Sequence, residues 1–273
     1  MTVTLLGTGC PPPNPRRRGP AVLVARGDAR FLVDAGSGVA VQLQLAGVRV
    51  LDLHRIFLTH LHSDHVIDLG HLLVTRWIIG QNAPLEVFGP TGIRAHVERL
   101  QALWEWDVDV RRSHMRDRAR PAVAVTEIQE GVVFRSGGVT VTAFSVEHEP
   151  VKPAFGFRFD GDDRAIVISG DTRPCENLIR HARDADLLIH ECTDATQTQW
   201  TPGCGWPSRE DKVKDLAAYH TGPDEVGQVA ARAKARTLVL THMMPASDPS
   251  DLAARAARAF PGRIVVGEDL LDV

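Results

Sequence analysis

Three histidines and one aspartate follow one another in the H-x-H-x-D-H motif of residues 60–65. Side chains two residues apart on an extended segment point to the same side, so His60 and His62 can bind one cation. Asp64 and His65 follow at a turn and can reach a second cation nearby. Imidazole nitrogens combined with carboxylate oxygens are typical of zinc sites, and less exclusively of manganese or iron sites. The motif therefore predicts a metal site.

Three further candidate ligands each follow an apolar run that predicts a β-strand. They are His148 after Val139–Val146, Asp171 after Ala165–Ser169, and His242 after Thr237–Leu240. Each of these residues alone is typical of an ordinary loop. Together with the motif they supply five histidines and two carboxylates, which is enough for a site with two metal ions.

Short strands and amphipathic helices would have to position these side chains. The apolar run Arg55–Leu58 precedes the motif, and beyond it the apolar residues from Val66 to Trp77 follow helical spacing. Strands come in groups, helices follow each group, and no Ser/Gly-rich linker divides the 273 residues. We expect one α/β domain, 1–273, in which two β-sheets pack together with helices on their outer faces.

The ordered motifs of the chain resemble those of a known superfamily. Asp34 in the stretch 32–36, the motif of residues 60–65 and the three later ligands are similar to the motifs of the metallo-β-lactamase superfamily. Within it the chain looks most like the branch of ribonuclease Z and the arylsulfatase-like phosphodiesterases. The resemblance covers nearly the whole chain, and it implies a four-layer αββα sandwich with the site at one edge of the packed sheets.

The resemblance also divides the candidate ligands between two zinc ions, with manganese or iron as alternatives. The two sets are His60, His62 and His148 for one ion, and Asp64, His65 and His242 for the other. Asp171 is implied to bridge the ions. Asp34 is implied to anchor the ligands from behind without binding an ion itself.

The implied chemistry is ester hydrolysis by a hydroxide that bridges the two ions. Asp64 would also orient the attacking water. His220 and Glu191 lie in segments similar to the His-Ser/Thr and His-Glu motifs of the ribonuclease Z branch. We therefore expect His220 to protonate the leaving group as a general acid, with Glu191 as its supporting carboxylate.

The size and charge of the chain favour a small substrate. Ribonuclease Z carries a long arm that grips tRNA between the motifs matching His148 and Asp171, whereas only 23 positions separate these residues here (171 − 148). The 31 basic and 34 acidic residues give a net charge of −3, which argues against nucleic acid as a partner. The leading hypothesis is a hydrolase of small phosphodiesters or sulfate esters. The alternatives are a ribonuclease Z-type endonuclease that processes the 3′ ends of tRNA and a non-catalytic zinc-binding protein.

Several side chains are candidates to hold such a substrate. Arg76 and Trp77 lie on the helix that leaves the motif, and Arg111 and Arg112 belong to an arginine-rich segment, 107–120, that we expect to be a loop. Guanidinium groups bind phosphate or sulfate through two parallel hydrogen bonds. A solvated loop whose arginines pair with neighbouring aspartates is the alternative. Trp200 and Trp206 are expected in a lid with an apolar wall.

The N-terminal sequence, the apolar stretches and the cysteines indicate where the protein is expected to reside. The N-terminus has no basic segment followed by an apolar one, and no apolar stretch approaches the ~20 residues that cross a bilayer. The four cysteines form no C-x-x-C pair. We therefore expect a reduced cytoplasmic protein with no membrane partner, and a homodimer is compatible with the resemblance.

Overall fold

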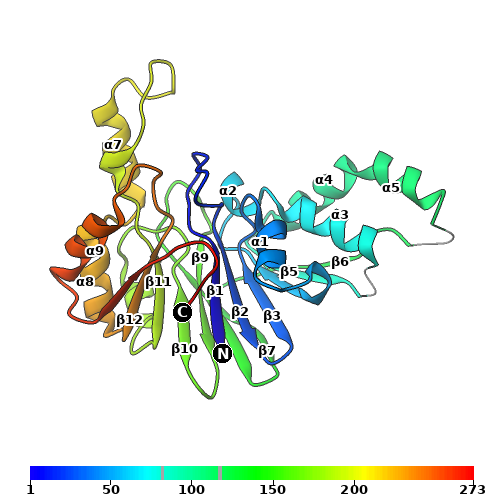
Figure 1. The fold of residues 1–273 in the computed structure, drawn as a ribbon, viewed down its shortest axis with the longest axis horizontal. Helices are drawn as coiled ribbons and strands as arrows, with labels where there is room; N and C mark the ends of the chain where they lie inside the picture. The colour runs from blue at the N-terminus through cyan, green and yellow to red at the C-terminus, as the bar shows by residue number, and fades with distance from the viewer. Residues whose placement is uncertain (81–82, 116–118) are drawn as a thin grey trace.

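Two seven-stranded β-sheets pack face to face, with helices on their outer sides (Figure 1). The computed structural model describes residues 1–80, 83–115 and 119–273. In spatial order the first sheet consists of β14 (Leu271–Asp272), β1 (Thr2–Gly7), β2 (Ala21–Arg26), β3 (Ala29–Val33), β4 (Arg55–Phe57), β5 (Leu85–Gly89) and β6 (Val123–Glu127). The second sheet consists of β13 (Arg263–Val266), β12 (Thr237–Thr241), β11 (Leu187–Glu191), β10 (Ala165–Ile168), β9 (Phe155–Asp160), β8 (Val139–Ser145) and β7 (Gly131–Ser136).

The helices cover both outer faces, so the expected four-layer αββα sandwich is confirmed. Over the first sheet lie α1 (Val39–Leu45), the short 3₁₀ helix Val50–Asp52, α2 (Ser63–Val66), α3 (Leu69–Ile79) and α4 (Ile93–Leu103), and α5 (Glu105–Arg112) continues from α4 beyond the sheet (Figure 1). On the side of the second sheet lie α6 (Glu176–His181), the 3₁₀ turn Ala195–Gln197, α7 (Arg209–Tyr219), α8 (Pro223–Ala233) and α9 (Pro249–Ala257).

Apolar side chains form three buried layers. Strand β8 alternates, with Val139, Val141 and Ala143 buried between the sheets and the threonines between them partly exposed. The central layer contains six buried phenylalanines from both sheets, and the ring of Phe57 lies 4.8 Å from that of Phe88 and 5.6 Å from that of Phe157. Two further layers join each sheet to its own helices. This packing makes the sheets a rigid support for the loops at their edges.

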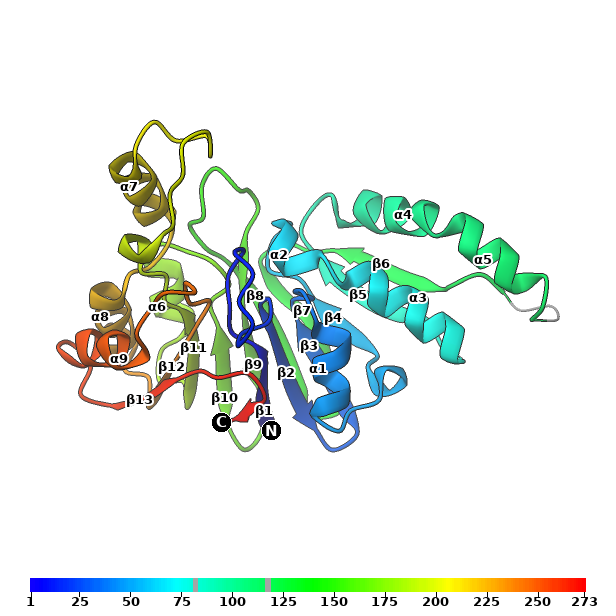
Figure 2. The ribbon, with the colours of Figure 1, turned by 45° about the horizontal axis from the view of Figure 1, so that its top comes forward.

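Two helical parts stand away from this body. Figures 1 and 2 show α7 at one end of the molecule and α5, which continues from α4, at the other. The expectation of a loop from residue 107 is wrong, because Glu105–Arg112 is helical. Ion pairs one helical turn apart stabilise this helix, with 2.8 Å between Arg111 Nε and Asp107 Oδ2. Of the helices in the ranges described, none is long and apolar enough to span a bilayer.

One edge of the sandwich collects the ends of the strands that carry the candidate ligands. Strands β8 and β10 both run antiparallel to β9, and β10, β11 and β12 are parallel, so the carboxyl ends of β8, β10 and β12 meet at one edge. The backbone N–H of Phe155 donates to the carbonyl of Thr59 at 2.9 Å, which ties the second sheet to the segment after β4. The fold thus brings loops from both sheets to one place.

Candidate metal centre

Two clusters of ligand atoms lie side by side at this edge. One contains His60, His62, His148 and Asp171, and the other contains Asp64, His65 and His242, with all ligand atoms of a cluster within 4.8 Å of one another. The carboxylate of Asp171 lies between them. Its Oδ2 is 3.4 Å from Nε2 of His65 and of His242, and 3.9 Å from Nε2 of His60 and of His148. The structure therefore brings together all seven residues that the sequence singled out as ligands.

Four of the five imidazoles are oriented by an acceptor on their Nδ1 side. The distances are 2.7 Å from His65 to Asp34 Oδ2, 3.0 Å from His60 to Thr59 Oγ1, 3.0 Å from His148 to the Tyr219 carbonyl, and 3.1 Å from His242 to Thr193 Oγ1. An acceptor on one ring nitrogen directs the other nitrogen towards a shared point, as in protein metal sites. Sequence reasoning missed the two threonines and Tyr219, although Thr59 adjoins the motif and Thr193 stands two residues after Glu191.

The donor set fits a pair of divalent cations. Nε2 of His60 and of His65 is buried without a hydrogen-bond partner among the described residues, which is costly unless a cation occupies the centre. Burial lowers the pKa of His60, His62 and His148. At neutral pH these imidazoles therefore have the neutral form that binds metal. Five imidazoles and two carboxylates are compatible with a dinuclear metal site.

A second pair of buried groups adjoins the clusters. His220 Nδ1 lies 2.9 Å from both carboxylate oxygens of Glu191. Glu191 also accepts from the backbone N–H of Thr172 at 2.6 Å and from Thr193 Oγ1 at 2.8 Å, so its position is fixed. Burial lowers the pKa of His220, but the charge and hydrogen bond of Glu191 outweigh it and raise that pKa to about 9. The imidazole is thus held protonated at neutral pH.

Two pockets open beside the clusters. One, of about 270 Å³, is lined by Asp64 together with Cys10, Arg17 and Arg18. The other, of about 420 Å³, is lined by His62 and His148 together with Trp206 and Tyr219, among others. A substrate that spans the centre can therefore meet a basic wall on one side and an aromatic wall on the other.

Comparison with known proteins identifies the family. The model of the Beta-lactamase superfamily domain matches residues 29–243. This chain belongs to the metallo-β-lactamase superfamily. It is 40% identical over 276 residues to the ribonuclease Z of Mycobacterium sp. (strain KMS), an alignment that covers 99% of this chain and 94% of that protein.

Solved structures of the superfamily agree with this assignment. The human tRNase Z, short form, has a TM-score of 0.73 and 27% identity, and the match covers 100% of this chain and 98% of that one. The metallo-β-lactamase fold protein YhfI from Bacillus subtilis has a TM-score of 0.77 at 23% identity, with 100% and 98% covered, and shows the same fold. The expected resemblance to the ribonuclease Z branch is confirmed, and the chain is a metal-dependent hydrolase of phosphodiester bonds.

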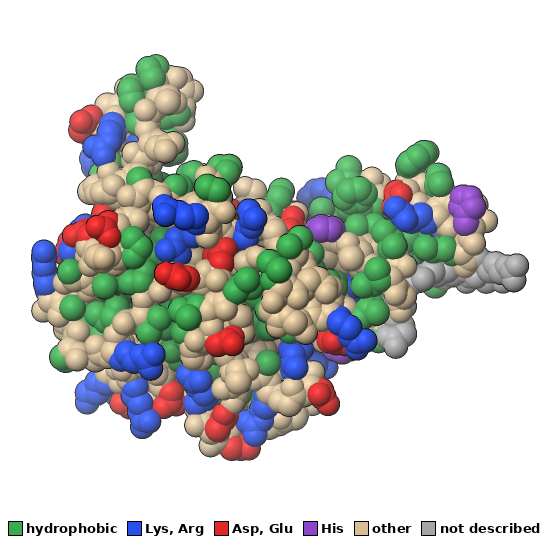
Figure 3. Space-filling view, viewed as in Figure 1, with side chains coloured by type: hydrophobic (Ala, Val, Ile, Leu, Met, Phe, Trp, Pro, Cys, Tyr) green, Lys and Arg blue, Asp and Glu red, His purple; other side chains and the backbone are tan. Residues whose placement is uncertain are grey.

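Two expectations about the substrate are wrong. The relatives that match nearly the full chain are named ribonuclease Z, which overturns both the small phosphodiester or sulfate ester and the exclusion of nucleic acid. The short connection between His148 and Asp171 does not distinguish this chain from these relatives. The alignment covers 94% of the Mycobacterium protein, so that protein has no room for a long insertion between the matching residues either. The net charge is a sum over the whole chain, and on the face in Figure 3 basic and acidic side chains are interspersed. The net charge therefore does not describe the pocket beside Asp64, which Arg17 and Arg18 line.

The expected substrate contacts of Arg76 and Trp77 do not agree with the structure either. Arg76 is 1% exposed, and its Nη1 donates to the carbonyls of Val50 at 2.6 Å and of Leu53. Trp77 is 2% exposed, and its Nε1 donates to the carbonyl of Ala119 at 2.7 Å. Both side chains are directed into the packing between α3 and its neighbours rather than towards the metal centre.

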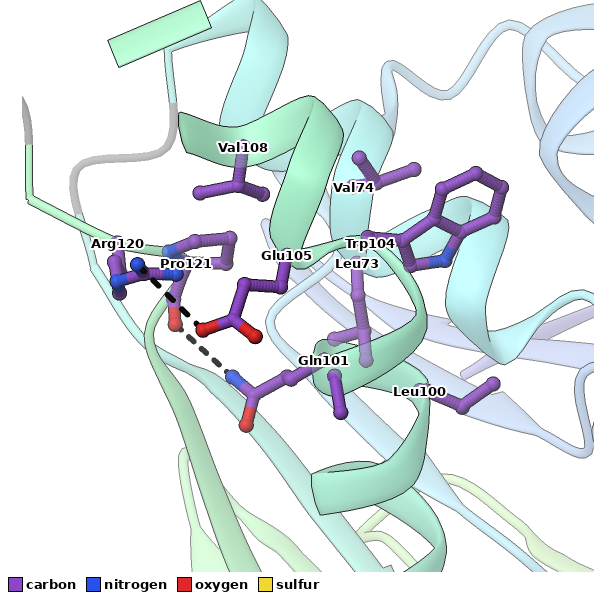
Figure 4. Close-up of a pocket in the computed structure, with 10 residues that line it drawn as sticks. Leu73, Val74, Leu100, Gln101, Trp104, Glu105, Val108, Arg120 and Pro121 are labelled. Carbon is purple, nitrogen blue, oxygen red and sulfur yellow. Dashed lines mark hydrogen bonds and ion pairs between the residues drawn. The ribbon is translucent and has the colours of Figure 1, made fainter. Parts of the chain in front are cut away.

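Arg111 and Arg112 are equally remote from the centre. They lie on α5, in the part of the chain that projects at the far end of the first sheet (Figure 1), and pair with Asp107 and Asp109 of the same helix. Figure 4 shows how Arg120 faces Glu105 across a pocket at the base of this projection, with Arg120 Nη2 3.8 Å from Glu105 Oε1. Arg116 and Arg118 lie outside the described residues. The described arginines of this segment pair with neighbouring aspartates, as the alternative expectation had it, and do not form a phosphate site.

Substitution of Arg76 by methionine should lower the free energy of unfolding by about 3 kcal/mol. The change leaves the buried carbonyls of Val50 and Leu53 without their donor, and each such group costs about 1–3 kcal/mol. Urea unfolding followed by circular dichroism measures the effect. Arg49→Met, at a side chain that is 75% exposed, is the matched control and should change stability by less than about 0.5 kcal/mol. Unchanged stability with a weaker affinity for substrate would show that Arg76 is a substrate contact after all.

Proposed function

We propose that this chain is a ribonuclease Z-type endonuclease that removes the 3′ trailer from precursor tRNA. The observation that carries the proposal is the pairing of His220 with Glu191 beside two adjoining ligand clusters, between which the carboxylate of Asp171 lies. A buried, protonated donor next to a metal centre suits a substrate whose leaving group is a poorly stabilised ribose oxygen. The names of the full-length relatives support the same substrate.

The proposed cofactors are two zinc ions, held by the seven ligands of the two clusters. Histidine-rich ligand sets with carboxylates favour zinc, and manganese or iron would also accept them. When bound, such a pair of cations activates water at neutral pH and neutralises charge on the phosphate. We further propose that Asp34 holds His65 in its orientation through their 2.7 Å contact.

The remaining steps belong to the side chains of the protein. Asp64 Oδ2 lies 3.3 Å from His242 Nε2 and 3.5 Å from His65 Nε2, at the wall of the basic pocket, where it can orient the attacking water. His220 donates its proton to the leaving oxygen as the phosphorus–oxygen bond breaks. Glu191 stabilises the imidazolium before this transfer and keeps Nδ1 engaged, so Nε2 is the nitrogen that donates.

Replacement of Glu191 by glutamine should move the alkaline limb of the pH–rate profile to lower pH. The carboxylate raises the pKa of His220, and the acid is active only while protonated, so activity falls as pH rises through that pKa. Without the negative charge the pKa of His220 drops, by about 1–3 units for a contact this close. The profile of kcat for precursor tRNA between pH 6 and 10 measures the shift. A limb that stays in place or moves upwards would remove Glu191 from this role.

The proposed function is tested with zinc-loaded protein and a precursor tRNA that carries a 3′ trailer. We expect cleavage between the acceptor stem and the trailer, with mapped product ends, and a rate that falls as salt is raised because the substrate is a polyanion. The same preparation is given nitrophenyl phosphodiester, phosphomonoester and sulfate esters. If it cleaves one of these efficiently and leaves precursor tRNA intact, the proposal is wrong.

A further inference from the structure

The pocket beside His62 and His148 has an aromatic side chain that the catalytic scheme does not use. Its lining combines these two histidines with Pro150, Val151, Ala218, Trp206 and Tyr219 and with one carboxylate, that of Asp215, around a volume of about 420 Å³. Trp206 comes from the segment between the 3₁₀ turn Ala195–Gln197 and α7. The pocket is therefore mostly apolar and aromatic, although it opens directly beside two of the proposed metal ligands.

Contacts with three neighbouring residues hold Trp206 in place. Its indole Nε1 donates to Asp215 Oδ2 at 2.9 Å, and its backbone carbonyl accepts from Trp200 Nε1 at 3.1 Å. Lys212 Nζ lies 5.1 Å from the ring centre and also donates to the carbonyl of Gln199 at 2.6 Å. These contacts fix the ring while leaving the side chain partly exposed. A planar group can stack on the ring without first ordering it.

We infer that Trp206 stacks on the base of a nucleotide that flanks the scissile phosphodiester. The inference rests on the proposed function. A phosphate bound at the metal centre places its two neighbouring nucleotides within reach of the two pockets beside the centre. Of these two pockets, the one beside His62 and His148 has aromatic side chains in its wall. Unpaired bases at RNA ends are commonly bound by aromatic side chains, and stacking tolerates any base because each has a π face.

The two pockets would bind different parts of the RNA. Arg17 and Arg18 line the pocket on the Asp64 side, where a phosphate backbone is the matching ligand, whereas Trp206 offers a surface for a base. Trp206 is thus a positioning residue for the substrate and takes no part in proton transfer. Its loss should weaken RNA binding and leave metal content unchanged.

The test uses zinc-loaded protein and a labelled acceptor-stem minihelix with a 3′ trailer, in which a methylene group replaces the bridging oxygen of the scissile bond. Fluorescence anisotropy gives the Kd for the intact RNA and for two versions with an abasic nucleotide on one or the other side of that bond. Trp206→Ala should raise the Kd for intact RNA by about tenfold or more. For the abasic version that lacks the stacked base, the same variant should bind as the wild type does.

Two further variants separate stacking from a structural role. Trp206→Phe keeps a ring face and should restore most of the affinity, and Trp106→Ala, at a tryptophan on α5 that is 77% exposed, should bind all three RNAs like the wild type. An equal loss for Trp206→Ala on intact and abasic RNA, or no loss at all, would overturn the inference. Failure of the proposed function would appear separately, as wild-type protein that leaves precursor tRNA uncleaved.

Discussion

Replacing Asp171 by alanine should reduce bound metal from two ions per chain to one or none and slow precursor tRNA cleavage by about a thousandfold or more. Oδ2 of Asp171 lies within 3.9 Å of Nε2 of four histidines, two from each cluster. Its removal leaves four converging imidazoles with one fewer negative charge to balance two cations. Because the proposed ions would supply both the activated water and the charge neutralisation, we expect the loss to appear in kcat.

Metal content by mass spectrometry and single-turnover cleavage measure this prediction on the same preparation. Asp162→Ala is the matched control, since that carboxylate is 84% exposed and pairs with Arg26 at the surface. It should retain both metal and activity. An Asp171→Ala variant that is folded by circular dichroism and still binds two ions with wild-type activity would contradict the bridging role.

Replacing His220 by alanine should slow precursor tRNA cleavage by about 10²–10⁴-fold while metal content stays at two ions per chain. The imidazole is bound to Glu191 at 2.9 Å, and its ring lies 5.1 Å from that of His148 and 5.6 Å from that of His242. It therefore stands next to the proposed ligands without being needed to complete either set. The effect should be large only where the leaving oxygen needs a proton.

Bis(p-nitrophenyl) phosphate supplies the comparison, because nitrophenolate leaves as a stable anion. His220→Ala should hydrolyse it at nearly the wild-type rate, and His114→Ala, at an exposed histidine just after α5, should leave both activities intact. One ring nitrogen of His220 also lies within 4.8 Å of ligand atoms of Asp171 and His242. If the variant loses metal, or loses both activities equally, His220 is a ligand or a packing residue rather than the acid.

The candidate ligands could be predicted because their signal is local. The motif of residues 60–65 places four side chains through its own spacing, and His148, Asp171 and His242 each follow a strand that periodicity identifies. Since β8, β10 and β12 run in one direction, the sheet itself brings these residues to the same edge. The Nδ1 partners Thr59 and Thr193 carry no pattern of their own and appear only in three dimensions.

The substrate contacts failed because they depend on tertiary partners. Arg76 is an arginine on the helix after the motif, and nothing in the sequence indicates that the carbonyls of Val50 and Leu53 would enclose its guanidinium. The missed helix Glu105–Arg112 did have a signal, namely opposite charges four residues apart at Asp107 and Arg111. Helix α7 had one as well, since Ser208 caps it by accepting from the backbone N–H of Asp211.

The most direct test of the two-ion centre is an anomalous difference map from crystals of the zinc-loaded protein, recorded at the zinc absorption edge. We predict two peaks. One should lie at about 2.0–2.2 Å from ligand atoms of His60, His62 and His148, and the other at the same distance from those of Asp64, His65 and His242, with Asp171 reaching both. A map with no peak among these side chains, in protein that still cleaves precursor tRNA, would contradict the account.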